Sequence, residues 1–227
     1  MWRKEKRLHH SKLLILGSSL LALVSCGNYD DDDYSQGPQQ EELQTGTFQA
    51  RLTPLNSNVS GLINGTAEIV FEGDTFEART NVIDAPDSTH PQYIYLGSTC
   101  PDPSADSNQD SFIDGIEVQS TAGKIIIPLD DDLATQSSGS FPIGVSYQYN
   151  ESTSFLEMVS ELKMPDDDAT DSVTRLGQND EIDLDGRVVI IHGVPASATL
   201  PMTVRGVDGA TAQETLPIAC GVLVRKP

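Results

Sequence analysis

The stretch that follows Pro103 and Ser104 carries the residue types in this chain best suited to chemistry. Residues 105–117 read ADSNQDSFIDGIE, with no helical pattern around them. Counted from Asp106, positions 1, 3, 5, 9 and 12 bear side-chain oxygens, and position 7 adds a backbone carbonyl. Calcium takes six to eight hard oxygen ligands, and alternate residues of a curved loop turn inward around such an ion. The six candidate ligands are Asp106, Asn108, Asp110, Phe112, Asp114 and Glu117.

This spacing is that of an EF-hand-type calcium loop, in which the last carboxylate closes the shell with two oxygens. Ile113 at position 8 is the apolar residue that such a loop packs onto a core. Ser111 stands at position 6, where glycine usually allows a positive φ, and serine adopts it at a cost of about 1 kcal/mol. We therefore expect calcium binding of reduced affinity. No flanking helices are predicted, so the loop is expected to be inserted in a β domain.

A solvated acidic loop is the alternative interpretation of the same residues. Soft metals are disfavoured, because the loop holds no histidine and no thiol. Two other acidic runs, LDDDL and MPDDDATD, lack the ligand spacing and are typical of solvated faces.

The first 25 residues predict a secretory signal segment rather than part of the fold. A basic start is followed by the apolar run LLILGSSLLALV, which is too short to span a bilayer as a mature helix. Residues 23–26, Leu-Val-Ser-Cys, resemble a bacterial lipobox, which predicts lipidation of Cys26 and stable membrane anchoring. Gly27 is not the aspartate that retains lipoproteins in the inner membrane, so the outer membrane is expected. A plain secretory signal is the alternative.

Residues 26–45 are expected to be the lipidated cysteine and a disordered acidic tether. They contain an aspartate run and almost no apolar residues, so they cannot bury enough surface to offset their ordering entropy. The acidic run resembles surface-export signals of some bacterial lipoproteins, and a self-repelling spacer explains it equally well. Residues 46–227 are then a single domain, long enough to bury a core.

The charge of the mature chain disfavours nucleic acid as a partner. Removing residues 1–25 takes away five of 14 basic and one of 34 acidic residues, which leaves a formal charge of −24. Nucleic acid and anionic membrane surfaces need the opposite sign, whereas divalent cations are natural partners. With Cys26 lipidated, Cys100 and Cys220 remain as an even pair in an oxidising compartment, which predicts a disulfide.

The hydrophobic period of the mature chain is two, which indicates strands. Residues 66–83 predict two strands joined at Gly73 and Asp74, a common hairpin turn pair. Short β-branched or aromatic runs between Gly, Pro, Asp and Asn clusters predict an all-β, antiparallel Greek-key sandwich or barrel with long acidic loops near 98–120 and 163–182. Residues 154–162 fit a strand or one or two helical turns, and we assign them as a strand. The further strands are expected at 46–55, 91–97, 124–130, 145–150, 187–194 and 216–225.

Two C-terminal runs are GRVVIIHGV, which contains His192, and LPIACGVLV, which has Ala-Cys-Gly-Val at 219–222. They resemble the copper/zinc superoxide dismutase family, in which a strand ending in a copper-ligand histidine precedes a last strand with this Ala-Cys-Gly-Val motif. Cys100 follows the strand that carries the family's His-X-His motif, so the resemblance implies a Cys100–Cys220 disulfide. The run GTAEIVFEGDTFEARTNV is similar to early strands of the related chordin-type (CHRD) domains. Together these motifs cover most of residues 46–225.

The copper ligands of that family are not preserved in this chain. Tyr93-Ile94-Tyr95 replaces the His-X-His motif, and of four histidines two lie in the signal segment, leaving His90 and His192. A dismutase site needs six histidines and an aspartate, so we expect a superoxide-dismutase-like sandwich that is not an enzyme. The tyrosines at 93, 95, 147 and 149 are expected to be cross-strand packing pairs or an aromatic surface.

The expected function is therefore that of a non-catalytic, calcium-binding lipoprotein of the bacterial cell envelope. Calcium is its predicted cofactor, and its partners are the membrane, through the lipid anchor, and an unknown protein or envelope component. The alternative is a metal-handling or residual redox protein that uses His192, although a lone histidine at a strand end is usually structural or solvated. A structural envelope module with calcium as its one ligand remains a third reading.

Overall fold

The computed structural model describes residues 46–135, 139–154, 157–158 and 184–227. All of them belong to the compact unit Glu41–Pro227. The predictions for the signal segment, for Cys26 and the tether, and for the acidic loop near 163–182 lie outside the described residues.

Strands make up most of the described elements, and the helices are short. The elements are, in chain order, β1 (Gly46–Pro54), α1 (Ser57–Ser60), β2 (Asn64–Glu72), β3 (Thr75–Ile83), β4 (Gln92–Tyr95), the 3-10 turn η1 (Pro103–Ala105), α2 (Gly115–Ala122), β5 (Ile125–Pro128), β6 (Tyr147–Ser154), β7 (Val188–His192), α5 (Ala212–Thr215), β8 (Pro217–Val222) and β9 (Val224–Arg225).

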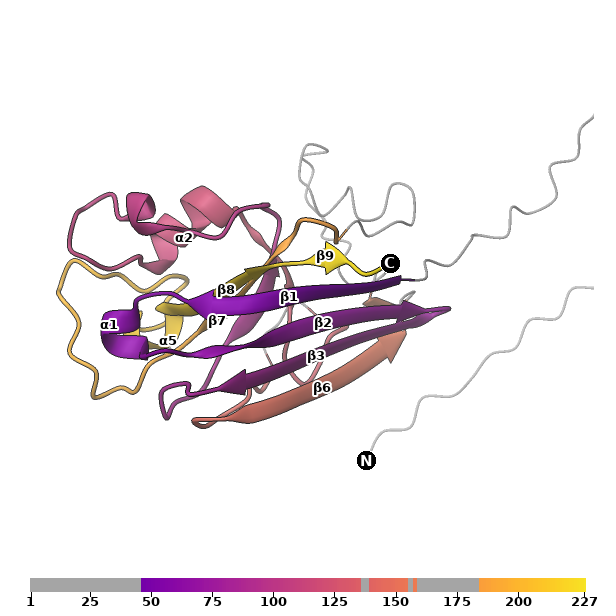
Figure 1. The fold of residues 1–227 in the computed structure, drawn as a ribbon. Helices are drawn as coiled ribbons and strands as arrows, with labels where there is room; N and C mark the ends of the chain where they lie inside the picture. Colours follow the sequence, from indigo (N-terminus) through magenta and orange to yellow (C-terminus); the bar gives the residue numbers. More distant parts are fainter. Residues whose placement is uncertain (1–45, 136–138, 155–156, 159–183) are drawn as a thin grey trace, which may run out of the picture. The chain divides into compact units, whose positions relative to one another are not determined.

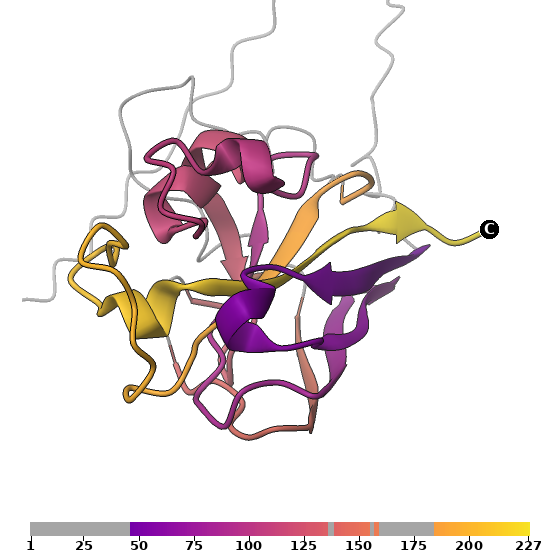
Figure 2. The same cartoon turned by 60° about the vertical axis from the view of Figure 1, so that its left-hand side comes forward.

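The strands form one antiparallel sheet in the order β5-β4-β7-β8-β1-β2-β3-β6, with β9 paired to β1. Figure 1 shows β1, β2, β3 and β6 side by side as long strands. The neighbours β4–β7, β8–β1 and β3–β6 are far apart in sequence, and such long return connections are those of Greek-key topologies. The sheet curls on itself as a half-barrel, as Figure 2 shows. The prediction of an all-β antiparallel sandwich or barrel is confirmed.

The first three strands alternate between a buried and an exposed face, as their period of two predicts. Phe48, Ala50 and Leu52 of β1 point inward, and β2 and β3 follow the same alternation. The hairpin prediction is also confirmed, because Glu72 pairs with Thr75 across a turn in which Gly73 has φ 60°. The inward side chains form the main core.

Strands β7 and β8 are buried along nearly their whole length. Their inner side chains join the main core, and the outer ones form a second core with α2, which contains Val118, Val188, Ile190 and Cys220. Figure 2 places α2 against this part of the sheet. Strands covered on both faces read as continuous apolar runs, and this explains the run Val188–Ile191.

Two local predictions need correction. A helix does follow the acidic loop, because α2 begins at Gly115, so the loop is flanked on its C-terminal side. The predicted strand at 154–162 is wrong at Glu157 and Met158. Ser154 is the last residue of β6, whereas Glu157 and Met158 are helical, and the other residues of that segment lie outside the described part.

Candidate functional site: the acidic loop and an aromatic cleft

The acidic loop, residues 106–117, runs from η1 into the first turn of α2. Phe112 and Ile113, at positions 7 and 8, are both buried. Phe112 packs in the main core, and Ile113 packs in the second core. The prediction that Ile113 anchors the loop on a core is confirmed, and Phe112 adds a second anchor.

One side-chain amide binds both backbone groups of Ile113. Asn56 Nδ2 donates to the Ile113 carbonyl at 2.9 Å, and Asn56 Oδ1 accepts from the Ile113 N–H at 2.8 Å. The same Nδ2 donates to the Pro217 carbonyl at 2.9 Å. Asn56 has φ 48°, a conformation that asparagine adopts more readily than most residues. Asn56 thus ties the acidic loop to β8. Sequence reasoning missed it, because it lies 57 positions away.

The first half of the acidic loop is folded by its own carboxylates. Asp106 Oδ1 accepts from the Asp110 N–H at 3.1 Å, and its Oδ2 accepts from the Ser111 N–H at 2.8 Å. Asn108 Oδ1 accepts from the Asp110 N–H at 2.9 Å. Ser111 has φ 71°, so position 6 adopts the left-handed conformation expected for this type of loop. The backbone is thus curved around positions 1, 3 and 5.

Asp110 has one oxygen that lacks a partner within the described part of the chain. Its Oδ1 accepts from the Phe112 N–H at 2.9 Å. Its Oδ2 is buried and, among the described residues, is the one buried side-chain N or O atom with no hydrogen bond. Leaving a buried charged oxygen unpaired is costly, so such an atom in a folded protein calls for a ligand. A cation at this point would supply the missing interaction.

Asp114 and Glu117 at positions 9 and 12 form a capping box on α2. Asp114 Oδ1 accepts from the N–H groups of Ile116 and Glu117, and Glu117 Oε2 accepts from the Asp114 N–H at 3.0 Å. Such a box satisfies the first N–H groups of a helix. The capping box spans four residues, 114–117, and it accounts for the positions of Asp114 and Glu117 without a metal. The sequence signal for the box, an acid three residues before a glutamate, was present.

Glu117 also closes the loop on its first half. Its Oε1 accepts from the Ser107 N–H at 2.7 Å, the Ser107 hydroxyl at 2.8 Å and the Asn108 N–H at 3.3 Å. Burial alone would raise the pKa of Glu117, but these bonds and that from Asp114 outweigh it and lower the pKa. Glu117 is therefore held as a carboxylate that joins positions 2 and 3 to position 12.

The other oxygen of Asp114 binds a residue outside the acidic loop. Its Oδ2 accepts from the Arg205 N–H at 3.1 Å, and the Arg205 guanidinium lies 3.9 Å away. Beside it, a Cβ on Gly115 would lie 3.0 Å from the Val207 side chain, so glycine permits this close approach. The segment that contains Arg205 and Val207 is therefore pinned to the start of α2.

The described residues contain no group of three His, Cys, Asp or Glu side chains arranged to hold a metal. The predicted ligands are brought into one loop, but several of their oxygens bind backbone N–H groups. Three features of the loop suit a bound cation: its curvature, the left-handed conformation at position 6, and one buried oxygen without a hydrogen bond in the described part of the chain. Direct coordination by Glu117 would require its carboxylate to give up bonds to Ser107 and Asn108.

Cys100 and Cys220 form a disulfide, with their Cα atoms 5.8 Å apart, so this prediction is confirmed. The bond links the segment just before the acidic loop to β8. Cys220 and Ile113 belong to the second core, and Cys100 packs against it. The acidic loop is therefore fixed at one end by a covalent bond and in its middle by Asn56 and Ile113.

His192 is buried at the end of β7, with a partner on each ring nitrogen. Nδ1 lies 2.8 Å from the Thr215 carbonyl, which can only accept, so Nδ1 carries the proton. Nε2 then accepts from the Tyr95 hydroxyl at 3.0 Å. Burial lowers the pKa of His192 to about 4, so the ring is neutral near pH 7. Burial likewise raises the pKa of Tyr95.

His90 does not join His192 in a shared metal site. Its Nδ1 lies 3.1 Å from the backbone carbonyl of His192, and its Nε2 lies 2.9 Å from the Pro86 carbonyl. Its ring stacks on Tyr147 at 5.3 Å. Tyr147 and Tyr149 are buried in the main core, in line with a packing role. His90 is thus part of the packing around Tyr147.

Tyr93, Tyr95, Phe141 and His192 line a cleft of about 990 Å³. Tyr93 is the hub, with ring centroids 5.4 Å from Phe141, 5.7 Å from His192 and 6.3 Å from Tyr95. The rings come from β4, β7 and the segment before β6. Sequence reasoning weighed an aromatic surface of tyrosines but did not place Phe141 and His192 in it, because no local spacing joins them.

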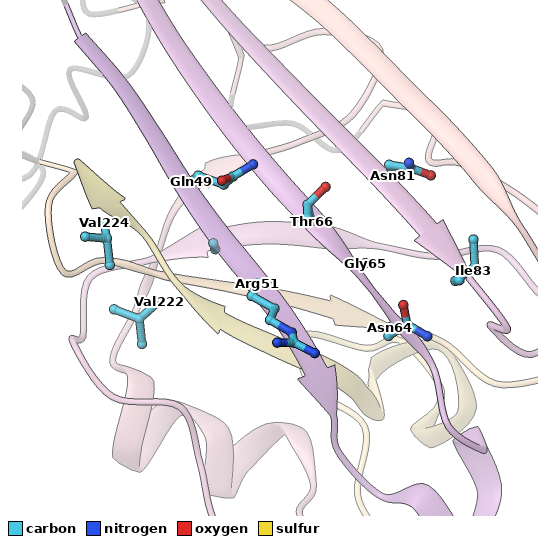
Figure 3. Close-up of a pocket in the computed structure, with 10 residues that line it drawn as sticks. Gln49, Arg51, Asn64, Gly65, Thr66, Asn81, Ile83, Val222 and Val224 are labelled. Carbon is cyan, nitrogen blue, oxygen red and sulfur yellow. The ribbon is translucent and has the colours of Figure 1, made fainter. Parts of the chain in front are cut away.

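A shallower hollow of about 670 Å³ lies on the outer face of β1, β2 and β3. Figure 3 shows Arg51, Thr66 and Asn81 across it, and these residues are paired across neighbouring strands. Polar side chains lie across its middle, and the apolar side chains of Ile83, Val222 and Val224 lie at its margins. It is an open surface, and its shape and side chains indicate a particular ligand less clearly than those of the aromatic cleft do.

The comparisons with known proteins add no family to these observations. No model of a known protein family matches the chain, and no curated protein sequence matches it. Within the described ranges, every helix is too short or too polar to cross a membrane.

Proposed function

We propose that this protein is a calcium-binding, non-catalytic lipoprotein of the bacterial cell envelope, with calcium held by the acidic loop. The observation that carries the proposal is the buried Asp110 Oδ2, which has no partner among the described residues, inside a loop with calcium-loop spacing. The left-handed φ of Ser111 supports it, because the sixth position of such loops requires this turn.

The donor set suits calcium rather than a softer metal. Asp106, Asn108, Asp110 and the Phe112 carbonyl offer hard oxygens, and position 9 often acts through a water molecule. Asp114 fits that indirect role, since both its oxygens already bind protein groups. Glu117 would supply the closing carboxylate once it gives up its bonds to Ser107 and Asn108. When bound, the ion would offset the negative charge of the loop's carboxylates, in a chain that is itself strongly negative.

The ion is proposed to stabilise shape rather than to perform a reaction. The acidic loop covers the second core beside the Cys100–Cys220 disulfide, and Asn56 binds its middle. A cation would hold the two halves of the loop together, and an ion that binds only the folded chain stabilises it by mass action. Extracellular calcium sites work at weak affinity, so a serine at position 6 is tolerable.

The envelope location rests on the sequence. The signal segment, the lipobox and the acidic tether predict a lipid anchor at Cys26, and Gly27 favours the outer membrane. The charge of the mature chain disfavours nucleic acid. The partner beyond the membrane is proposed to be a protein or another envelope component. No observation favours the alternative of a metal-handling protein, because both nitrogens of His192 bind protein groups.

Calcium binding is tested on the full-length mature chain by elemental analysis and by calorimetric titration of the chelator-stripped protein. The sharpest variant is Asp110→Asn. It keeps Oδ1 as acceptor for the Phe112 N–H but replaces the unpartnered oxygen with an NH₂ group, which repels a cation. We expect about one calcium per chain in the wild type. We expect at least a tenfold loss of affinity in the variant.

The matched control is Asp102→Asn, which alters an exposed aspartate that lies before the acidic loop and outside the ligand set. Asp102 Oδ1 caps η1 by accepting from the Ser104 N–H at 2.8 Å. Its change is expected to leave calcium affinity unchanged. Equal affinities for wild type and Asp110→Asn, or copper or zinc in place of calcium, would contradict the proposal.

The anchor is tested separately with Cys26→Ser in the producing cell. Wild-type protein is expected in the membrane fraction and to incorporate a labelled fatty acid, whereas the variant is expected to lose both. An unlabelled wild-type protein in the soluble fraction would reject the anchor without bearing on calcium.

A further inference from the structure

The aromatic cleft beside His192 has a floor of rings, and the described residues that line it carry no positive charge. Tyr93 is half-buried and makes edge contacts with Phe141 and Tyr95, so part of its surface faces the cleft. The Tyr95 hydroxyl donates to His192 Nε2 at 3.0 Å, and this bond joins the two rings in the floor of the cleft. Burial keeps His192 neutral. The electron-rich faces of such rings attract cations.

In the described part of the chain, the two charged residues that line the cleft are acids. Asp208 and Glu214 belong to the segment that forms its rim, and neither lysine nor arginine is among the described lining residues. Glu214 is held in place, because its Oε2 accepts from the Thr211 N–H and hydroxyl, each at 2.8 Å. Asp208 is near enough to Tyr95 to contribute to its raised pKa, after burial and the neighbouring Tyr93.

The rim is fixed by contacts elsewhere in the fold. Thr211 and Glu214 form a capping box on α5. The preceding segment is bound to Asp114 through the Arg205 N–H, and Val207 packs on Gly115. Acids held opposite a rigid aromatic floor lose little entropy when a ligand binds, and this favours affinity.

We propose that this cleft is a binding site for an organic cation, such as the guanidinium or ammonium group of a peptide or amine. The cation would lie on the Tyr93 ring and face the Asp208 and Glu214 carboxylates. A guanidinium suits both contacts, since it stacks on aromatic faces and pairs with carboxylates. The volume of about 990 Å³ admits the rest of a peptide-sized molecule. The proposal does not depend on calcium in the acidic loop.

The test is a titration of the full-length mature chain, in non-ionic detergent and calcium-containing buffer, with N-acetyl-arginine amide, followed by NMR shifts. N-acetyl-citrulline amide is the matched probe, because it has nearly the same shape without the charge. We expect the arginine probe to shift resonances of the cleft and to bind at least fivefold more tightly than the citrulline probe. Added salt is expected to weaken its binding.

Two variants locate the contacts. Tyr93→Leu keeps apolar volume and removes the ring, so binding of the arginine probe is expected to fall about fivefold to thirtyfold. Asp208→Asn removes a charge at a residue with φ 53°, which asparagine also adopts, so the backbone is not disturbed. This change is expected to weaken binding of the arginine probe and to leave binding of the citrulline probe unchanged. Glu72→Gln, on β2 and outside the cleft lining, is the charge control and should change neither.

Equal binding of both probes would overturn the proposal in favour of a neutral ligand such as a sugar. Binding of neither probe, or binding that Tyr93→Leu and Asp208→Asn leave unchanged, would also overturn it. Unchanged melting temperature and calcium affinity in both variants exclude misfolding as the cause of any loss. A failure of calcium binding would leave these outcomes untouched, so the two proposals are separable.

Discussion

The acidic loop and the aromatic cleft are built in opposite ways. The acidic loop is one continuous segment, and most of its polar contacts run between residues at most ten positions apart. The cleft is assembled from β4, β7, α5 and the segment before β6, so its parts meet through the sheet. A site made by local spacing is visible in sequence, whereas a site made by strand pairing is not.

The two regions nevertheless meet at Asp114. One of its oxygens caps the helix that ends the acidic loop, and the other binds the Arg205 N–H in the segment that leads to the cleft rim. The second core lies beneath the acidic loop, and it contains Tyr95 and, at its margin, Tyr93, both of which line the cleft.

Removing the disulfide is expected to have the largest effect. It closes a loop of 120 residues, so Cys100→Ser with Cys220→Ser should lower the free energy of unfolding by about 4 kcal/mol. Chemical denaturation of the full-length chain measures this. The acidic loop is expected to lose more order than the cleft, because Cys100 lies just before it. An unchanged unfolding midpoint would show that the bond contributes little to either region.

Protonation of His192 is expected to come next and to act on the cleft. Its pKa is about 4 in the folded state against 6.5 for an ordinary histidine, so the unfolded chain binds the proton more readily. Stability is therefore complete above pH 6.5 and falls as the pH drops toward 4, by about 3 kcal/mol. Tyr95, with its raised pKa, stays neutral over this range. Unfolding free energies of wild type and His192→Gln against pH measure it, and parallel curves would contradict it.

Asn56→Ala should destabilise the region around the acidic loop. The change removes hydrogen bonds to Ile113 and Pro217 and leaves their backbone groups unsatisfied, at a cost of about 2 kcal/mol. Calcium affinity should fall with it, while binding in the cleft should not. Asn56→Asp is the graded control, since it keeps the acceptor for the Ile113 N–H. Equal stability of Asn56→Ala and wild type would show that the Asn56 contacts do not hold the loop.

Ser111→Gly is expected to have the smallest effect, and in the opposite direction. Glycine adopts φ near 71° without the steric cost that serine bears, about 1 kcal/mol. This corresponds to about a fivefold gain in calcium affinity, measured by titration. Val145→Gly, at an exposed residue outside the acidic loop, should give no gain. A calcium affinity unaffected by Ser111→Gly would show that the conformation at position 6 does not influence metal binding.

The sequence predicted the fold well where one local rule decides the outcome. Alternation gave the first three strands, Gly73-Asp74 gave the hairpin, and the cysteine pair gave the disulfide. The helix after the acidic loop was missed, although Asp114 and Glu117 form a capping box, because the same residues were assigned to a metal. The resemblance to superoxide dismutase and chordin-type domains stays a prediction.

The sequence by itself determined the period-two strands, the curved loop with its left-handed serine, and the negative charge, because each depends on neighbouring residues or on composition. The tertiary structure alone decided that Asn56 binds Ile113, that Asp114 binds Arg205, and that the Tyr93 ring gathers Phe141 and His192. These contacts join residues far apart in the chain. They exist only once the strands are paired in register, since pairing places distant side chains within a few ångströms of one another.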